Sequence, residues 1–157
     1  MAASAFLALA VPIAVGWGCA RGDAQIESVS VRRVRILDLL LAVVAIGGTA
    51  TVALAMHEAG VAPAGLVAAR ALLVYGGFML LASPLGWRTA TIAPAVYLLA
   101  VIVVGRGEDI FHPAPWAWVA AGETSRASWL LTAALVGVGI TTHLVGPRGT
   151  PATEAHD

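Results

Sequence analysis

The sequence predicts an all-α membrane protein, a polytopic bundle of about five transmembrane helices. Its composition is 59% hydrophobic and 11% charged, whereas a soluble domain has roughly 45–50% apolar and about 25% charged residues. A bilayer core about 30 Å thick needs about 20 apolar residues in a helix, and five segments approach that length. Polar and glycine- or proline-containing breakers separate these segments, as expected at the ends of spans.

The predicted spans occupy residues 3–20, 39–56, 66–83, 89–104 and 127–145. The breakers between them are "RGD", "HEAGVAPAG", "SPLGWR" and "GRGED". The first segment has no basic n-region, so we expect a retained span and not a removable signal peptide. The fourth is short, and we expect it to take a turn from its flanks. Residues 1–146 therefore form a single transmembrane domain, and the polar residues 147–157 are predicted to be a disordered tail.

The distribution of arginine predicts the orientation, because short cytoplasmic loops carry an excess of basic residues. With five spans, one side collects Arg21, Arg32, Arg33, Arg35, Arg88 and Arg148. The other side has Arg106 and Arg126, with Arg70 close to a helix end. We therefore expect the N-terminus outside and the C-terminus inside, in a bacterial plasma membrane.

Several classes of function are disfavoured by what the sequence lacks. It contains no lysine and so no Walker-type phosphate loop, and its only His-Glu pair, His57-Glu58, does not continue as a His-Glu-x-x-His zinc motif. Cys19 is the single cysteine, which excludes a disulfide within one copy. Net charge is zero and the arginines form no extended cluster, so nucleic acid is not an expected partner. The chain is not expected to be an enzyme or to hold a cofactor.

Arg70 lies about one turn into the third predicted span. A charged side chain costs about 2.5–3.5 kcal/mol at the centre of a span and less near its end. Three interpretations are open: the side chain snorkels to the headgroups, it forms an ion pair with Glu58 or Glu108, or it contacts a substrate or partner.

The predicted outer side also gathers His57, Glu58, Glu108, Asp109 and His112. Imidazole and carboxylate are the ligand types of divalent metal sites. However, these residues lie on two loops with no motif spacing, so a solvated polar rim is favoured over a metal site.

The stretch "HPAPWAW" follows on the same predicted side. Pro113 and Pro115 forbid a regular helix there, and Trp116 and Trp118 suit the headgroup level of a membrane. An interfacial anchor is the simpler interpretation, and a recognition surface for cargo or a partner subunit is the alternative.

On the predicted inner side, Arg32, Arg33 and Arg35 precede the second span. The simpler interpretation is attraction to anionic lipid, about 1 kcal/mol per arginine, and the alternative is a segment that couples to a cytoplasmic subunit. Asp38 lies three residues after Arg35, on the same helical face, so a local ion pair is expected.

The order "AARALLVYGGFMLLAS", "LGWRTATIAPAVYLLAV", "PAPWAW" and a last span ending "GPRG" resembles a family of small multi-spanning actinobacterial membrane proteins. These proteins accompany ATP-binding-cassette exporters. The matching positions are Arg70, Gly76, Pro94, Tyr97, Trp116 and Trp118. The chain departs from the pattern at Val119, where a proline is usual, and at Ala71, where a polar residue is usual. The resemblance implies a membrane component of an exporter.

Two functions follow from these observations. The first is a permease-type or accessory subunit of an ATP-driven exporter, with membrane lipid, a separate ATP-binding subunit and other membrane subunits as partners. The second is a non-transport membrane protein that assembles or docks other proteins; a homo-oligomer is compatible with either. An ion-coupled transporter is less favoured because no acidic residue lies in the middle of a predicted span.

Overall fold

The computed structural model describes residues 2–26, 31–105, 116–120 and 125–145, with side chains described for 7–20, 36–105, 116–120 and 125–145. Every regular element among these residues is helical. The elements in chain order are α1 (Ala2–Ile26), α2 (Val31–Glu58), α3 (Gly65–Ala82), η1 (Ser83–Leu85), α4 (Trp87–Ala90), α5 (Ile92–Val104), η2 (Trp118–Ala120) and α6 (Arg126–Val145).

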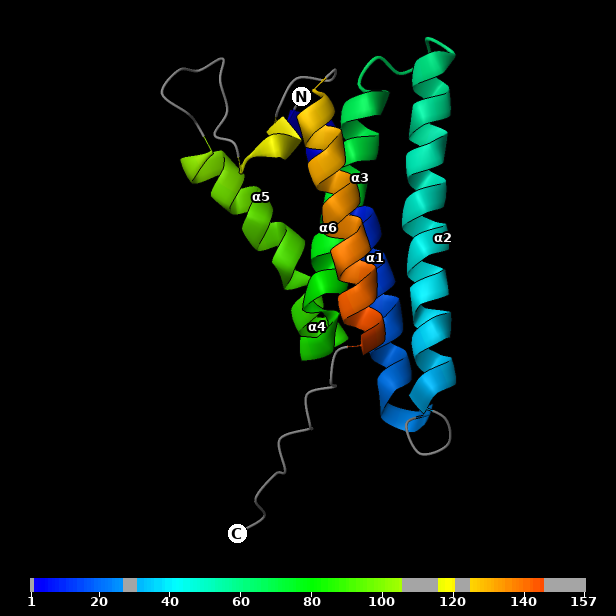
Figure 1. Cartoon of the computed structure of the whole chain (residues 1–157). Coiled ribbons are helices and arrows are strands. Elements are labelled where there is room, and N and C mark those ends of the chain that lie inside the picture. Colours follow the sequence, from blue (N-terminus) through cyan, green and yellow to red (C-terminus); the bar gives the residue numbers. More distant parts are fainter. Residues whose placement is uncertain (1, 27–30, 106–115, 121–124, 146–157) are drawn as a thin grey trace.

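The long helices form an up-and-down bundle (Figure 1). One end of the bundle, called here the Glu58 end, contains the start of α1, the end of α2 and the starts of α3 and α6. The opposite end, called the His143 end, contains the end of α1, the start of α2, α4 and the last turn of α6. Successive long helices run in opposite directions, as expected when apolar helices cross the same layer one after another.

Four helical segments are long and apolar enough to cross a membrane: Ile36–Glu58, Gly65–Leu85, Trp87–Val104 and Arg126–Val145. They overlap the second to fifth predicted spans. The fourth was expected to take a turn from its flanks and takes two residues, Trp87 and Arg88, from its N-terminal flank. The first predicted span lies within α1, whose described apolar stretch, Leu7–Ala20, is shorter. The described residues therefore confirm the all-helical class and the presence of helices that are long and apolar enough to cross a membrane. The predicted tail, residues 147–157, lies outside the described residues.

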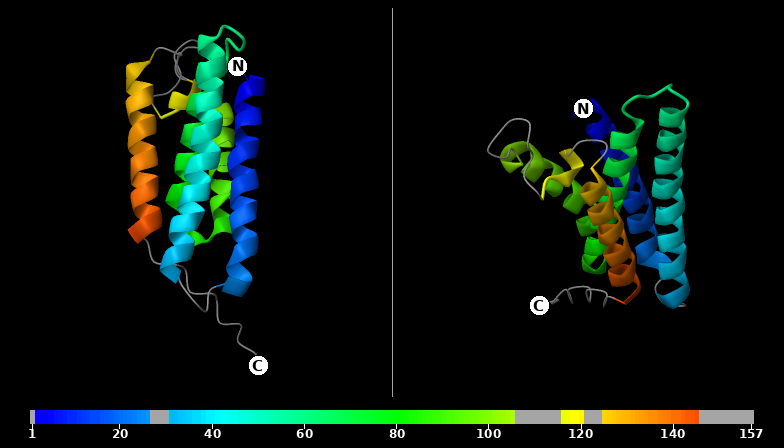
Figure 2. Two further views of the ribbon diagram at one scale, coloured as in Figure 1. Left: turned by 90° about the vertical axis from the view of Figure 1, so that its right-hand side faces the viewer. Right: turned by 45° about the horizontal axis from the view of Figure 1, so that its top comes forward.

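Helix α3 is the centre of the bundle and is contacted by α1, α2, α5 and α6 (Figure 2). In the most apolar 18-residue stretch of Gly65–Leu85, 67% of the residues are buried. In the corresponding stretch of Ile36–Glu58, 17% are buried. Small residues permit this enclosure, because helices in lipid associate by close backbone packing. A Cβ added at Gly139 of α6 would lie 2.8 Å from the backbone oxygen of Gly77 in α3.

The break between α4 and α5 has a local cause in Pro94. Its ring nitrogen has no hydrogen to donate to the carbonyl of Ala90, and its ring crowds that carbonyl. The helix is therefore interrupted at Thr91, whose hydroxyl donates to the carbonyl of Arg88 at 2.7 Å. Beyond this break, α5 leans away from the bundle toward the Glu58 end (Figure 1).

Candidate functional site

Arg70 is enclosed by the bundle and does not reach its surface. Its side chain is 1% exposed, and Nη2 donates a hydrogen bond to the backbone oxygen of Val119 at 3.3 Å. The geometry differs from the snorkelling arrangement, which would leave the guanidinium at the headgroups. Arg70 instead links the second turn of α3 to the segment that precedes α6.

Residues 116–120 are held by donors from three different helices, and we call them the clamped segment. Arg70 of α3 donates to the carbonyl of Val119, the hydroxyl of Tyr97 in α5 donates to that of Trp116 at 3.2 Å, and the hydroxyl of Ser128 in α6 donates to that of Trp118 at 2.9 Å. Because the segment is not part of a long helix, most of its carbonyls need such partners. The three bonds fix its position against the bundle.

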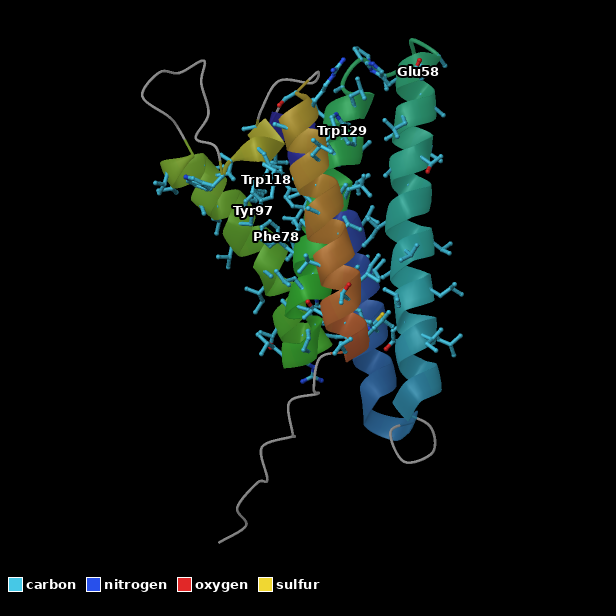
Figure 3. The ribbon with its side chains drawn as sticks, in the orientation of Figure 1. Glu58, Phe78, Tyr97, Trp118 and Trp129 are labelled. Atoms are coloured by element: carbon cyan, nitrogen blue, oxygen red, sulfur yellow. The ribbon has the colours of Figure 1, made fainter. Side chains whose placement is uncertain are left out.

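An aromatic cluster lies beside the clamped segment and consists of Phe78, Tyr97 and Trp118 (Figure 3). Phe78 and Tyr97 have ring centroids 4.5 Å apart, Tyr97 and Trp118 5.9 Å, and Phe78 and Trp118 6.4 Å. These separations are within the range of favourable aromatic pairs. Trp118 therefore packs into the bundle, whereas Trp116 remains 39% exposed.

Two polar atoms in this region are buried without a hydrogen-bond partner in the described part of the chain. They are Nε1 of Trp118 and the hydroxyl of Tyr75, in the helix that carries Arg70. Buried polar groups without partners are uncommon in folded proteins, so each needs a structural or functional explanation. Arg70, the clamped segment and the aromatic cluster together form the candidate site at the Glu58 end.

The other predicted outer residues are placed differently. Glu58 is exposed at the end of α2, on the far side of the Glu58 end from Trp118 (Figure 3). No ion pair joins Glu58 to Arg70, both of which are described. Glu108, Asp109 and His112 lie outside the described residues, so their predicted roles stay predictions. Within the described residues, no group of three His, Cys, Asp or Glu side chains could hold a metal ion.

Four polar or aromatic side chains from different elements meet at the His143 end. The Oγ atom of Ser83 lies 2.7 Å from Nδ1 of His143, and both residues are buried. The ring of Trp87 lies 5.3 Å from that of His143, and Nε1 of Trp87 donates to Oδ2 of Asp38 at 3.3 Å. We call these four residues the His143 cluster.

The direction of the Ser83–His143 bond follows from a second contact of the serine. The Ser83 hydroxyl donates to the carbonyl of Leu80 at 2.6 Å. Since a hydroxyl has a single hydrogen, His143 then donates from Nδ1 to the Ser83 oxygen. In this arrangement the histidine is not the base that would activate the serine, and the pair joins α6 to the end of α3.

Sequence reasoning missed the His143 cluster. Asp38 was expected to pair with Arg35, whose side chain is outside those described, as are the side chains of Arg32 and Arg33. The contact of Asp38 with Trp87 crosses 49 residues, and helical periodicity relates only residues three or four apart. The sequence contained only a weak indication of this cluster, because His143, Ser83 and Asp38 each lay at the same predicted side of the membrane.

The chain was compared with protein-family models, curated protein sequences and solved structures. None of them matches. The candidate site must therefore be interpreted from its own geometry. It consists of a buried cation, three aromatic rings and a segment clamped by three helices, an arrangement that can present a fixed surface at one end of a membrane bundle.

Proposed function

We propose that the chain is an accessory subunit of an ATP-driven exporter in the bacterial plasma membrane, and that a separate chain supplies the ATPase. The observation that carries this proposal is the apolar centre of the bundle. Ala42 and Ile46 of α2 and Val74 and Met79 of α3 are all at most 5% exposed. A path for polar cargo needs polar or wet lining, so this centre favours a supporting subunit over one that forms a path alone.

The polar groups of the described interior support the same role. Arg70 and the His143 cluster lie toward opposite ends of the bundle, with the apolar centre between them. Intramembrane polar groups that form a relay would be expected to continue through the middle. Charged side chains and an imidazole that lie toward the two ends suit contacts with other proteins at each membrane surface.

The proposed orientation puts the N-terminus outside and the C-terminus inside. Arg88 is exposed at the His143 end, and Arg32, Arg33 and Arg35 belong to the first turns of α2, which begin at that end. This arrangement agrees with the bias of basic residues toward the cytoplasmic side. The three arginines of α2, with Asp38, are the proposed coupling surface for the ATP-binding subunit.

At the opposite surface, the proposed contact with cargo or a partner subunit is centred on the clamped segment. Trp116 is exposed there, on a backbone fixed through Tyr97, and tryptophan is frequent among the residues that dominate binding energy at interfaces. Glu108, Asp109 and His112 are the proposed polar surroundings of this surface. Glu58, on the far side of the same end, is proposed as a separate contact. Arg70 and Trp118 act from behind it by holding the segment in position.

The test is purification of the tagged, full-length protein in a mild detergent, with mass spectrometry of the proteins that co-purify. The exporter proposal expects a protein with a nucleotide-binding domain, and expects its recovery to fall when Arg32, Arg33 and Arg35 are changed to glutamine. Arg126→Gln, which removes an exposed charge at the Glu58 end, is the matched control and should leave recovery unchanged.

Two results would contradict the exporter proposal. One is recovery of the protein alone or with partners that have no ATPase domain, which would favour the non-transport assembly protein. The other is an equal loss of the ATPase in the Arg126→Gln control, because the inner arginines would then not be the coupling surface.

A further inference from the structure

A pocket at the His143 end lies between α1 and the α4–α5 junction. Its volume is about 330 Å³, and Trp17, Ala20, Arg88 and Thr91 line it. The two sides come from segments far apart in the sequence that contact one another in the bundle. The pocket is therefore a product of helix packing and not of a single loop.

Next to the pocket, α1 and the α4–α5 junction are in close contact. A Cβ added at Gly16 would overlap Cγ2 of Thr91, which shows how closely these elements approach. The hydroxyl of Thr91 is turned to the carbonyl of Arg88. Trp17 and Arg88, by contrast, are both exposed, so their side chains are available to a ligand.

The charge of the pocket favours an anion. Arg88 is the charged side chain among its described lining residues, and a guanidinium binds phosphate oxygens through paired hydrogen bonds. Tryptophan favours the headgroup level of a bilayer and has one N–H to donate. Arg88 lies at the start of the apolar segment Trp87–Val104, which is where phosphates of the surrounding lipid lie.

An exposed apolar stripe runs along α1 from the pocket toward the membrane centre. It contains Leu7, Ala10 and Ala14, and it continues the face that carries Trp17. The stripe follows the three- and four-residue spacing of one helical face. A free phosphate would not use this stripe, whereas the acyl chains of a lipid would lie along it.

We propose that this pocket binds the phosphate headgroup of an anionic phospholipid from the surrounding bilayer, with Arg88 and Trp17 as its contacts. The acyl chains of the bound lipid lie on the α1 stripe. The site is independent of the exporter proposal, since it needs only the membrane-embedded bundle.

The test uses the full-length protein in nanodiscs made from equal amounts of phosphatidylglycerol and phosphatidylcholine with the same acyl chains. The protein is released from the nanodiscs, and native mass spectrometry measures the ratio of the two lipids that remain bound to it. One arginine at an anionic surface contributes about 1 kcal/mol, which corresponds to about a fivefold change in this ratio. Arg88→Gln should lower the preference for phosphatidylglycerol by about that factor, and Arg126→Gln should leave it unchanged.

A second measurement locates the lipid and does not depend on its release. Brominated lipids quench the fluorescence of nearby tryptophan side chains. The quenching that is lost in the Trp17→Phe variant is the contribution of Trp17. This contribution should be larger with brominated phosphatidylglycerol than with brominated phosphatidylcholine, and Arg88→Gln should remove the difference.

Three results would overturn the proposal. The first is an equal loss of lipid preference in the Arg88 and Arg126 variants. The second is a Trp17 contribution that does not distinguish the two brominated lipids. The third is displacement of phosphatidylglycerol by inorganic phosphate, which would identify the pocket as a site for free anions.

Discussion

At the scale of single residues, Arg70 has the clearest structural role. An enclosed cation is costly in a membrane, and its hydrogen bond to Val119 holds the clamped segment. Arg70→Met keeps an extended apolar side chain but removes the donor, so the Val119 carbonyl loses a charged partner. We expect the free energy of unfolding in detergent to fall by about 1–3 kcal/mol, as measured by denaturant titration.

The control for this substitution is Arg126→Met, at the same end of the bundle. Arg126 is exposed, and surface substitutions usually change stability by no more than about 0.5 kcal/mol. Similar values for the two variants would show that the enclosed position of Arg70 does not contribute to stability.

Ser83 provides a second prediction at this scale, because it is buried and its hydroxyl is shared between Leu80 and His143. Ser83→Ala leaves the Leu80 carbonyl and Nδ1 of His143 without this partner and should lower the thermal stability, at a cost of about 1–3 kcal/mol. Thr141→Val is the matched change, since the exposed Thr141 hydroxyl bonds only to Gly137 of its own helix among the described contacts. A loss of stability in Thr141→Val as large as in Ser83→Ala would contradict a specific role for the buried bond.

At the scale of helices, the close approach of α3 and α6 depends on glycine at one position. A Cβ at Gly139 would meet the backbone oxygen of Gly77 at 2.8 Å, and backbone cannot move aside as a flexible side chain does. Gly139→Ala should therefore force the helices apart and destabilise the protein by about 1–3 kcal/mol, as measured by unfolding in detergent.

Gly137, two residues earlier in α6, is the control for this prediction. A Cβ there meets no atom within 4 Å, so Gly137→Ala should be neutral or should stabilise the helix by up to about 1 kcal/mol. If both alanine variants behave alike, the contact of Gly139 with Gly77 does not limit the packing of the two helices.

At the scale of the whole molecule, the arrangement of the ends predicts a membrane orientation. Glu58 and Val145 are exposed at opposite ends of the bundle. In a Cys19→Ala background, a cysteine at Glu58 should react with an impermeant thiol reagent in whole cells. A cysteine at Val145 should react only after the membrane is opened. The reverse pattern would show that the orientation is inverted, and labelling of both in intact cells would contradict their separation by the membrane.

The sequence by itself determined which segments form the helices of the bundle. Apolar segments separated by breakers predict helices that cross a membrane, because each helix satisfies its own backbone hydrogen bonds in lipid. The predicted span at 89–104 needed only the two preceding residues, Trp87 and Arg88, to match the apolar segment Trp87–Val104. The interruption of the helix at Thr91 was not predicted, although Pro94 is its local cause.

The tertiary structure alone decided which side chains meet. The enclosure of Arg70 depends on Val119, and the His143 cluster depends on contacts between residues 49 and 60 positions apart. The helices have weak amphipathic patterns because lipid and protein interior are both apolar, so hydrophobicity does not tell the two faces apart. The choice of α3 as the central helix therefore arises from the fit of small residues such as Gly77 and Gly139, and this fit exists only once the helices are packed.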